Sequence, residues 1–568
     1  MSMFRADNPL IVQGDKTVLL EVANPRYPPA RDALARFAEL EKSPEYIHTY
    51  RITSLSLWNA ASAGLTAAEV LADLEEYAKY QLPGNIARDI QDYMSRYGRL
   101  KLIREGENLL LVSDDAILMV EIVQHKKVQR YITSQLGPTR LLINPAFRGH
   151  IKQALLQIGY PAEDLAGYVT GDELPIELLP TTQEGCPFNI RDYQRQAAEV
   201  FYAGGSARGG SGTIVLPCGA GKTIVGMAAM QQLQTSTLIL SPNTVAVRQW
   251  ISELLDKTTL SADLVGEYSG LQKEIRPVTI STYQIITYRK RGAAKGSAEE
   301  FPHFGLFNAR NWGLIIYDEV HLLPAPVFRI TAELQARRRL GLTATLVRED
   351  GLEGDVFSLI GPKKFDVPWK DLEKQGWIAT AACHEVRIPL DESQRMEYAL
   401  ANQRLKYSVA AHNLRKLPVL DALLDRHASE NILVIGMYLD QLEQIAAQLN
   451  APLITGQTPV REREKLYEQF RTGEVKRLVV SKVANFSIDL PDANVAIEIS
   501  GTFGSRQEEA QRLGRILRPK RDGSVAHFYA IVTRDTVDQT FNANRQRFLT
   551  EQGYKYEILY ENEVLNSA

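Results

Sequence analysis

A glycine-containing stretch between a strand-like run and a helix-like run could bind phosphate. Residues 213–216 (TIVL) are apolar and favour a strand, and PCGAGKT at 217–223 follows directly. Its glycines let backbone N–H groups curl round phosphate oxygens, and the next helix adds the positive end of its dipole. Lys222 would then meet the β- and γ-phosphates, and the Thr223 hydroxyl would bind Mg²⁺. The spacing predicts ATP and Mg²⁺ as ligands. The expected contacts of the loop are Pro217, Cys218, Gly219, Ala220, Gly221, Lys222 and Thr223.

Two adjacent carboxylates about a hundred residues later could supply the rest of a hydrolytic site. LIIYDEVH at 314–321 is a buried strand in pattern and ends on Asp318 and Glu319. Ligands of parallel sheets bind at the carboxyl ends of the strands. We expect Asp318 to hold Mg²⁺ through water, and Glu319 to orient and deprotonate the attacking water. A lone histidine is more often structural, but the spacing of His321 indicates a link from the nucleotide to a later motif.

Three arginines spaced by three could complete such a site from elsewhere in the chain. QRLGRILRPK at 511–520 carries Arg512, Arg515 and Arg518, which would share roughly one helix face. Alone, this is a basic solvated face. Beside a phosphate loop in another domain, arginines stabilise charge on the transferring phosphoryl group. We therefore expect catalytic roles for Arg515 and Arg518, and nucleotide contacts from Gln511 and Arg512.

The composition bounds the remaining possibilities. The chain has 568 residues, a net charge of −3 and 45% hydrophobic residues, which fits about three or four globular domains. No apolar run is long enough for a membrane span, and the N-terminus lacks a signal-peptide pattern. Three dispersed cysteines favour neither disulfides nor zinc and fit a reducing compartment. A nucleic-acid partner would need local basic patches.

The elements that must position these groups are parallel strands with crossover helices. From about residue 186, short β-rich runs alternate with helical stretches, and a second such set begins near 430. This pattern predicts an α/β fold with two consecutive parallel-sheet domains. The runs expected as strands are TIVLP, TLILSP, VTIST, LIIYDEV and LGLTAT in the first set, and NILVIG, PLITG, RLVVS, VAIEIS and AHFYAIV in the second.

A smaller α+β region precedes the two domains. Thr66 and Glu69 form a capping box before an amphipathic helix, a second helix follows, and two strands flank REGEN as a hairpin. Two helices and a hairpin are typical of a winged-helix unit. The first helix is acidic and the second is charge-balanced, whereas attraction to phosphate needs net positive charge. We therefore expect this region to dock a protein or to be structural rather than to bind DNA.

The motifs together resemble those of superfamily 2 helicases. RDYQ is similar to the adenine-reading motif, which implies nucleotide contacts for Arg191 and Gln194. TAT is similar to the motif that couples ATP to nucleic acid, which implies that role for Thr343 and Thr345. SKVANFSIDLP is similar to a motif that touches nucleic acid and, through Asp489, the nucleotide. By the same resemblance, the stretches expected to contact the nucleic-acid backbone are 241–250, 281–284 and 454–459.

The resemblance is closer still to the XPB family of DNA repair helicases, over roughly residues 8 to 560. LPCGAGKT, DEVH, LGLTATLVRED and SRQEEAQRLGRILRPK carry it. It implies two tandem RecA-like motor domains and an ATP-dependent 3′→5′ DNA helicase of nucleotide excision repair that acts on duplex or forked DNA. It also implies that Arg348, Glu349 and Asp350 act in strand separation. The chain lacks the long charged tails typical of eukaryotic members, which favours a bacterial or archaeal source. We therefore expect a cytoplasmic, nucleoid-associated protein.

The expected domains follow from these motifs. They are an N-terminal docking domain (1–135), a small damage-recognition-like module with a linker (136–185), a first motor domain (186–388), and a second motor domain (389–568) with a basic thumb-like helical segment near 392–416.

Several alternatives stay open at the level of sequence. The same motor could translocate on double-stranded DNA and remodel a repair or transcription complex without separating strands. A structural ATP-binding subunit is less compatible with an intact Glu319, because a scaffold needs no water-activating carboxylate. An RNA helicase also stays open, because the preference for DNA rests on the resemblance to the XPB family alone. The acidic N-terminal helix suggests a protein partner, such as the nuclease found with some prokaryotic relatives.

Overall fold

Two compact units divide the chain. One comprises residues 1–39, 50–216 and 221–367, and the other comprises 40–49, 217–220 and 368–568. The computed structural model describes residues 4–42, 46–183, 185–206, 208–217, 219–290, 292, 300–335, 337–344, 353–367, 369–377, 379–481, 493–501 and 525–566. Within these ranges no helix is long and apolar enough to span a bilayer.

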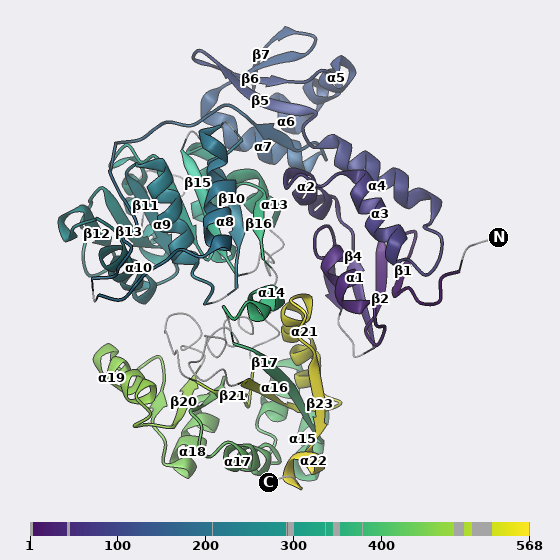
Figure 1. Ribbon diagram of the computed structural model, residues 1–568, viewed down its shortest axis with the longest axis vertical. Coiled ribbons are helices and arrows are strands. Elements are labelled where there is room, and N and C mark those ends of the chain that lie inside the picture. Colours follow the sequence, from purple (N-terminus) through teal and green to yellow (C-terminus); the bar gives the residue numbers. More distant parts are fainter. Residues whose placement is uncertain are drawn as a thin grey trace. The chain divides into compact units, whose positions relative to one another are not determined.

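The first unit contains a seven-stranded sheet in which every pairing is parallel (Figure 1). Its strand order is β12-β13-β11-β14-β15-β10-β16. The strands are β10 (Ser211–Val215), β11 (Thr237–Ser241), β12 (Val265–Tyr268), β13 (Val278–Thr282), β14 (Leu314–Asp318), β15 (Arg338–Thr343) and β16 (Lys363–Asp366). The helices are α8 (Asp192–Tyr202), α9 (Lys222–Leu233), α10 (Thr244–Lys257), α11 (Tyr283–Ile286), α12 (Ala325–Glu333) and α13 (Glu353–Asp355), with the short turns η4 (Pro302–Asn308), η5 (Val320–Leu322) and η6 (Val356–Ile360).

Both faces of this sheet are buried, which explains its continuous apolar runs. Helices α8, α9 and α10 pack on one face, where Trp250 and Ile316 meet beside Gly226. On the other face, side chains such as Leu240 and Tyr317 pack against α11, α12 and η6 in one hydrophobic cluster. The predicted RecA-like α/β domain is confirmed, and all five runs expected as strands form strands.

The second unit contains another seven-stranded parallel sheet, ordered β19-β20-β18-β21-β22-β17-β23. Its strands are β17 (Ala381–Ile388), β18 (Ile432–Gly436), β19 (Leu453–Ile454), β20 (Arg477–Ser481), β21 (Val495–Glu498), β22 (Ala526–Thr533) and β23 (Tyr556–Tyr560). Its helices are α14 (Trp369–Lys374), α15 (Arg395–Leu400), α16 (Gln403–Ala411), α17 (Lys416–Arg426), α18 (Leu439–Leu449), α19 (Val460–Arg471), α21 (Val537–Glu551) and α22 (Glu561–Leu565), with the 3-10 turn η7 (Glu392–Gln394).

The second sheet confirms a second RecA-like domain, but this domain begins earlier in the chain than the sequence predicts. Strand β17 pairs in parallel with β22 and β23, so residues 381–388 lie in the second sheet, whereas we had expected them in the first motor domain. The thumb-like segment is helical, as α15 and α16. Two of its cations are engaged structurally: Arg415 forms a two-pronged ion pair with Glu561, and the buried Lys416 ammonium lies 2.9 Å from Asp538.

The N-terminal region begins with a four-stranded sheet of order β1-β2-β4-β3 and four helices. Its elements are β1 (Leu10–Val12), β2 (Thr17–Glu21), α1 (Tyr27–Leu34), β3 (Glu39–Lys42), β4 (Ile47–Arg51), α2 (Ser54–Ser62), α3 (Ala67–Tyr77) and α4 (Gly84–Arg96). The capping box is present, with the Thr66 hydroxyl accepting from the Glu69 backbone N–H at 3.3 Å. The acidic face of α3 is partly neutralised, because Arg36 pairs with Asp73 and Arg26 with Glu76.

The predicted hairpin is present but is not a free wing. Its strands, β5 (Leu100–Glu105) and β6 (Asn108–Val112), pair with each other and also with β9 (Ala162–Asp164) and β8 (Arg140–Ile143). With β7 (Ile132–Gly137) they form a five-stranded sheet ordered β7-β8-β6-β5-β9. Helices α5 (Ala116–Gln124), α6 (Lys126–Gln129) and α7 (Arg148–Gln157) complete this module, together with the 3-10 turn η1 (Pro145–Phe147). The winged-helix pattern thus holds for the order of elements only, and the expected boundary at 135/136 falls inside this sheet.

The stretch expected as a linker is bound along the first motor domain. Leu174 N–H donates to Gln234 O at 3.0 Å, and Leu179 N–H donates to Lys257 O at 2.9 Å. A Cβ at Gly171, whose φ is +78°, would lie 2.3 Å from the Gly313 nitrogen. Buried backbone groups need such partners, so this segment is a strap fixed to the motor domain.

Candidate active site

The phosphate loop ends where helix α9 begins. Gly221 precedes the helix with φ 79° and ψ 47°, a left-handed conformation that glycine adopts without steric cost. A Cβ there would lie 2.4 Å from the Gln194 side-chain nitrogen. Gln194 Oε1 in turn accepts from the Arg191 backbone N–H at 3.0 Å. The structure thus brings the expected adenine-reading glutamine against the loop, with Lys222 and Thr223 in the first turn of α9.

Asp318, at the carboxyl end of β14, is held by three neighbouring elements. Its Oδ2 accepts from the Trp250 indole N–H at 3.0 Å and from the Ser241 hydroxyl at 3.2 Å. The Tyr283 hydroxyl donates to its backbone carbonyl at 2.9 Å. These donors come from α10, the end of β11 and the start of α11. They fix one carboxylate oxygen and the orientation of the group.

The electrostatics of the two carboxylates differ. Burial, followed by the charge of the adjacent Glu319, raises the pKa of Asp318 to about 6. Burial would also raise the pKa of Glu319, but the Lys222 ammonium and His321 outweigh it and lower that pKa. Two neighbouring carboxylates with pKa values pushed apart are typical of sites in which they have different tasks.

Glu319 is the most constrained residue of the site. Its φ of 50° and ψ of 57° are left-handed, which costs an L-residue about 1–2 kcal/mol. Its Oε1 lies 3.4 Å from Lys222 Nζ. Its Oε2 is buried without a hydrogen-bond partner among the described residues. An observed backbone outlier whose carboxylate lies beside Lys222 and His321 indicates a functional position.

His321 connects this carboxylate to the next motif. Its Nδ1 lies 3.4 Å from Glu319 Oε2 and shares a 2.7 Å hydrogen bond with the Thr343 hydroxyl. The His321 ring and the Thr343 hydroxyl are both buried. Lys222, Glu319, His321 and Thr343 at the end of β15 thus form a chain of contacts. Its role in coupling the nucleotide to nucleic acid stays a prediction.

The available donors fit Mg²⁺ bound together with a nucleotide. No group of three or more His, Cys, Asp or Glu side chains in the described part of the chain is arranged to hold a metal. Mg²⁺ usually takes one or two carboxylates plus substrate phosphates and waters rather than an all-protein cage. Asp318 supplies such a carboxylate, and Thr223 supplies a hydroxyl.

Several predicted site residues lie outside the described residues. They are Cys218, Thr345, Arg348, Glu349, Asp350, Asp489, Gln511, Arg512, Arg515 and Arg518. Their roles stay predictions.

Sequence reasoning missed the residues that hold Asp318. Ser241 and Trp250 lie in a stretch expected to contact nucleic acid, and Tyr283 lies in another. In the structure these three side chains turn inward to the site. Only their position after predicted strands β11 and β13 could have signalled this, because carboxyl ends of neighbouring parallel strands converge.

The comparison with known proteins identifies the family. "DNA 3'-5' helicase XPB" of Mycobacterium tuberculosis is 56% identical over 563 residues, which cover 99% of this chain and all of that protein. The protein of the same name from Kineococcus radiotolerans is 54% identical over 559 residues, or 98% of this chain and 97% of that one.

The chain belongs to the XPB family.

More distant XPB relatives and family profiles agree with this. A "General transcription and DNA repair factor IIH helicase/translocase subunit XPB" from Enterocytozoon bieneusi is 33% identical over 97% of this chain and 93% of that one. The profile "ERCC3/RAD25/XPB C-terminal helicase" matches residues 372–568. "Type III restriction enzyme, res subunit" matches 187–348, and "Helicase conserved C-terminal domain" matches 10–136.

Replacing Trp250 with Phe should slow ATP hydrolysis by about ten- to a hundred-fold, the usual effect of removing a partner that orients a metal-binding carboxylate. Phe donates nothing to Asp318, and it also lacks the outer indole ring atoms that lie beside Gly226. The Mg²⁺ concentration for half-maximal ATPase rate should rise as well. Trp377→Phe, at a partly exposed tryptophan of the second unit, is the matched control. Equal rates for both variants would contradict an orienting role for the indole.

Proposed function

We propose that this chain is an ATP-dependent 3′→5′ DNA helicase that acts in nucleotide excision repair. The observation that carries the proposal is the continuous set of contacts from Lys222 through Glu319 and His321 to Thr343. Such a set joins the expected phosphate-binding lysine to the motif that responds to nucleic acid. Membership of the XPB family supports the choice of DNA and of the 3′→5′ direction.

The roles follow from the geometry. Lys222 would neutralise the β- and γ-phosphates once ATP displaces Glu319 from it. Asp318 and Thr223 would hold Mg²⁺, which polarises the phosphates when bound. Glu319 Oε2, buried and without a hydrogen bond from the described residues, would then accept a proton from the attacking water. General-base assistance of this kind contributes about 10²–10⁴-fold.

The remaining roles are proposed on the resemblance alone. Arg515 and Arg518 would stabilise charge on the transferring phosphoryl group, and Asp489, Gln511 and Arg512 would contact the nucleotide. Because these residues belong to the second motor domain, ATP would draw the two domains together and hydrolysis would release them. Such a cycle would move the motor along DNA, in the cytoplasm and on the nucleoid.

Glu319→Gln tests the function directly. Wild-type protein should hydrolyse ATP faster with single-stranded DNA than with RNA of the same sequence, and it should displace a strand from a 3′-tailed duplex. Glu319→Gln should still bind ATP but lose at least about a hundred-fold in rate, since the amide is no base. DNA-stimulated ATPase without strand displacement would favour a double-strand translocase. Unchanged turnover in Glu319→Gln would favour a structural ATP-binding subunit.

Replacing Arg348, Glu349 and Asp350 together with Ala should impair unwinding and spare the basal ATPase rate. The expected reason is that these charges act at the duplex fork, beyond the coupling motif, and not on ATP. Basal ATPase rate and strand displacement on the same forked substrate give the comparison. Equal loss of both activities would instead assign the triplet a structural role.

A nuclease that docks on the N-terminal region is the proposed protein partner. The partial neutralisation of α3 by Arg26 and Arg36 leaves less free acidic surface than the sequence indicates. Deletion of residues 1–99, which ends before the five-stranded sheet, should abolish co-purification with the nuclease while DNA-stimulated ATPase activity persists. Retained co-purification would remove this region as the docking site.

A further inference from the structure

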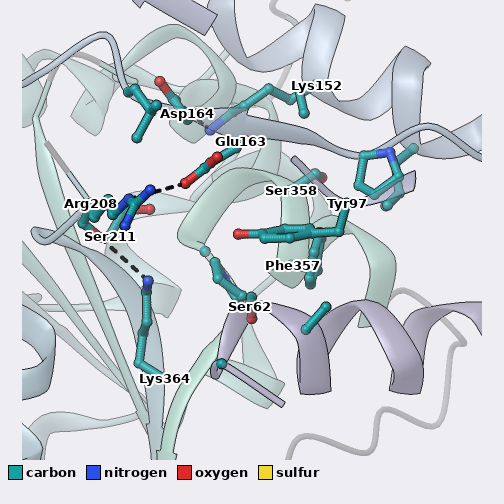
Figure 2. Close-up of a pocket in the computed structure, with 18 of the residues that line it drawn as sticks. Ser62, Tyr97, Lys152, Glu163, Asp164, Arg208, Ser211, Phe357, Ser358 and Lys364 are labelled. Carbon is teal, nitrogen blue, oxygen red and sulfur yellow. Dashed lines mark hydrogen bonds and ion pairs between the residues drawn. The ribbon is translucent and has the colours of Figure 1, made fainter. Parts of the chain in front are cut away.

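A pocket of about 310 Å³ lies where three parts of the first unit meet. Ser62 and Tyr97 come from helices α2 and α4, or just beyond them, Lys152 and Glu163 come from α7 and β9, and Lys364 comes from β16 (Figure 2). None of the residues proposed for ATP lines it. Ligand sites are common at such junctions, and this volume is at the lower end of the range for organic ligands.

Buried basic side chains outnumber carboxylates in and next to the wall of this pocket. Arg148, Lys152 and Arg339 are at most 5% exposed. They share one carboxylate, Asp164, which lies 2.7 Å from Arg148 and 3.0 Å from Lys152. Burial alone would raise the pKa of Asp164, but those two cations keep it below its usual value. Three buried cations thus face one anion, whereas buried charges are ordinarily paired.

Among the residues that the structure describes, Arg339 has hydrogen bonds but no carboxylate partner of its own. Its guanidinium donates to the carbonyls of Leu359 at 2.7 Å and Gln335 at 2.9 Å. The Tyr168 ring, which lines the pocket, lies 5.6 Å from the guanidinium carbon of Arg339 and 5.4 Å from that of Arg148. Carbonyl acceptors and the face of an aromatic ring stabilise the guanidinium charge of Arg339 but do not neutralise it.

The wall of the pocket carries two further groups suited to an anion. Lys364 Nζ donates only to the Arg208 carbonyl, at 3.3 Å, among the described residues, and burial lowers its pKa. The Tyr97 hydroxyl has no hydrogen-bond partner among those residues and points into the same space as Lys364 (Figure 2). Arg208 and Glu163, 3.4 Å apart, neutralise each other.

We propose that this pocket binds a small organic phosphate monoester, with its phosphate on Lys364 and the Tyr97 hydroxyl and its apolar body against Phe357. The charge supports a phosphate, because a phosphate monoester carries about −1.5 to −2 at pH 7 and a carboxylate only one charge. The volume supports an organic ligand, because it equals about ten waters and exceeds a bare phosphate. Tyr97 and Phe357 meet edge to face, with ring centroids 6.5 Å apart, and form an aromatic wall.

The pH dependence of binding follows from Lys152. Burial, and then Arg339 and Arg148, lower its pKa to about 7 against the opposing effect of Asp164. A bound anion favours the ammonium form and raises this pKa, so binding takes up a proton. Affinity should therefore be highest below pH 7 and fall above it, by at most about ten-fold per pH unit for one proton.

Calorimetric titration of the full chain tests the site, in the Lys222→Ala background to weaken phosphate binding at the ATP loop. Phenyl phosphate should bind at one site, and phenol should bind at least ten-fold more weakly. Lys364→Gln should weaken the binding of phenyl phosphate by ten-fold or more. Tyr97→Phe should weaken it by a smaller factor. Lys363→Gln is the matched control, because Lys363 is next along β16, pairs with Asp366 at 2.9 Å and does not line the pocket.

The possible outcomes distinguish a phosphate-monoester site from a site for an uncharged aromatic ligand or for a DNA end. Sulfate, which does not titrate between pH 6 and 9, should bind more weakly as the pH rises, which separates the titration of the protein's lysines, Lys152 and Lys364, from that of the ligand. Binding of phenyl phosphate that Lys364→Gln leaves unchanged would overturn the proposal, as would equal binding of phenol. Binding of only a 5′-phosphorylated oligonucleotide, without phenyl phosphate, would overturn it in favour of a DNA end. An unchanged basal ATPase rate in Lys364→Gln with wild-type Lys222 confirms that this substitution leaves the motor folded.

Discussion

The pairing of Lys222 with Glu319 is the interaction around which the first motor domain is arranged. An ammonium and a carboxylate that are both largely shielded from solvent lie 3.4 Å apart and stabilise each other, and neither is stable alone in a nonpolar interior. Holding them there requires two strands to end at the same sheet edge. It also requires Glu319 to adopt a left-handed backbone. A ligand that brings its own negative charge to Lys222 would release Glu319 from this pair.

The same constraint explains the neighbours of the pair. Asp318 is the neighbour of Glu319 in the sequence, and two adjacent carboxylates repel each other when both are ionised. The Trp250 and Ser241 donors stabilise Asp318 at its other side, while His321 lies against Glu319. Each carboxylate therefore has its own set of partners. The hydrogen bond between His321 and Thr343 joins this set of partners to the end of β15.

The small module is part of the first unit rather than a loosely tethered appendage. A strap of backbone hydrogen bonds fixes residues 172–179 to the motor domain. The buried cluster of Arg148, Asp164 and Lys152 interacts electrostatically with Arg339 of β15, the strand that ends at Thr343. These interactions join the module to the sheet of the motor domain, while a damage-recognition-like role of the module stays a prediction.

The sequence by itself determined the two parallel sheets and their apolar strands, because burial on both faces leaves a local pattern. From the phosphate-loop motif it also predicted which residues bind ATP. It did not reveal β12, β16, β17 or β23, which are mixed in polarity or lie at sheet edges. It misplaced β17 in the first domain, since β17 pairs with strands more than 130 residues later. Only the tertiary structure decided that Trp250, Ser241 and Tyr283 hold Asp318, and that three buried cations share Asp164, because these contacts join residues distant in the chain, and no local pattern encodes which side chains will meet.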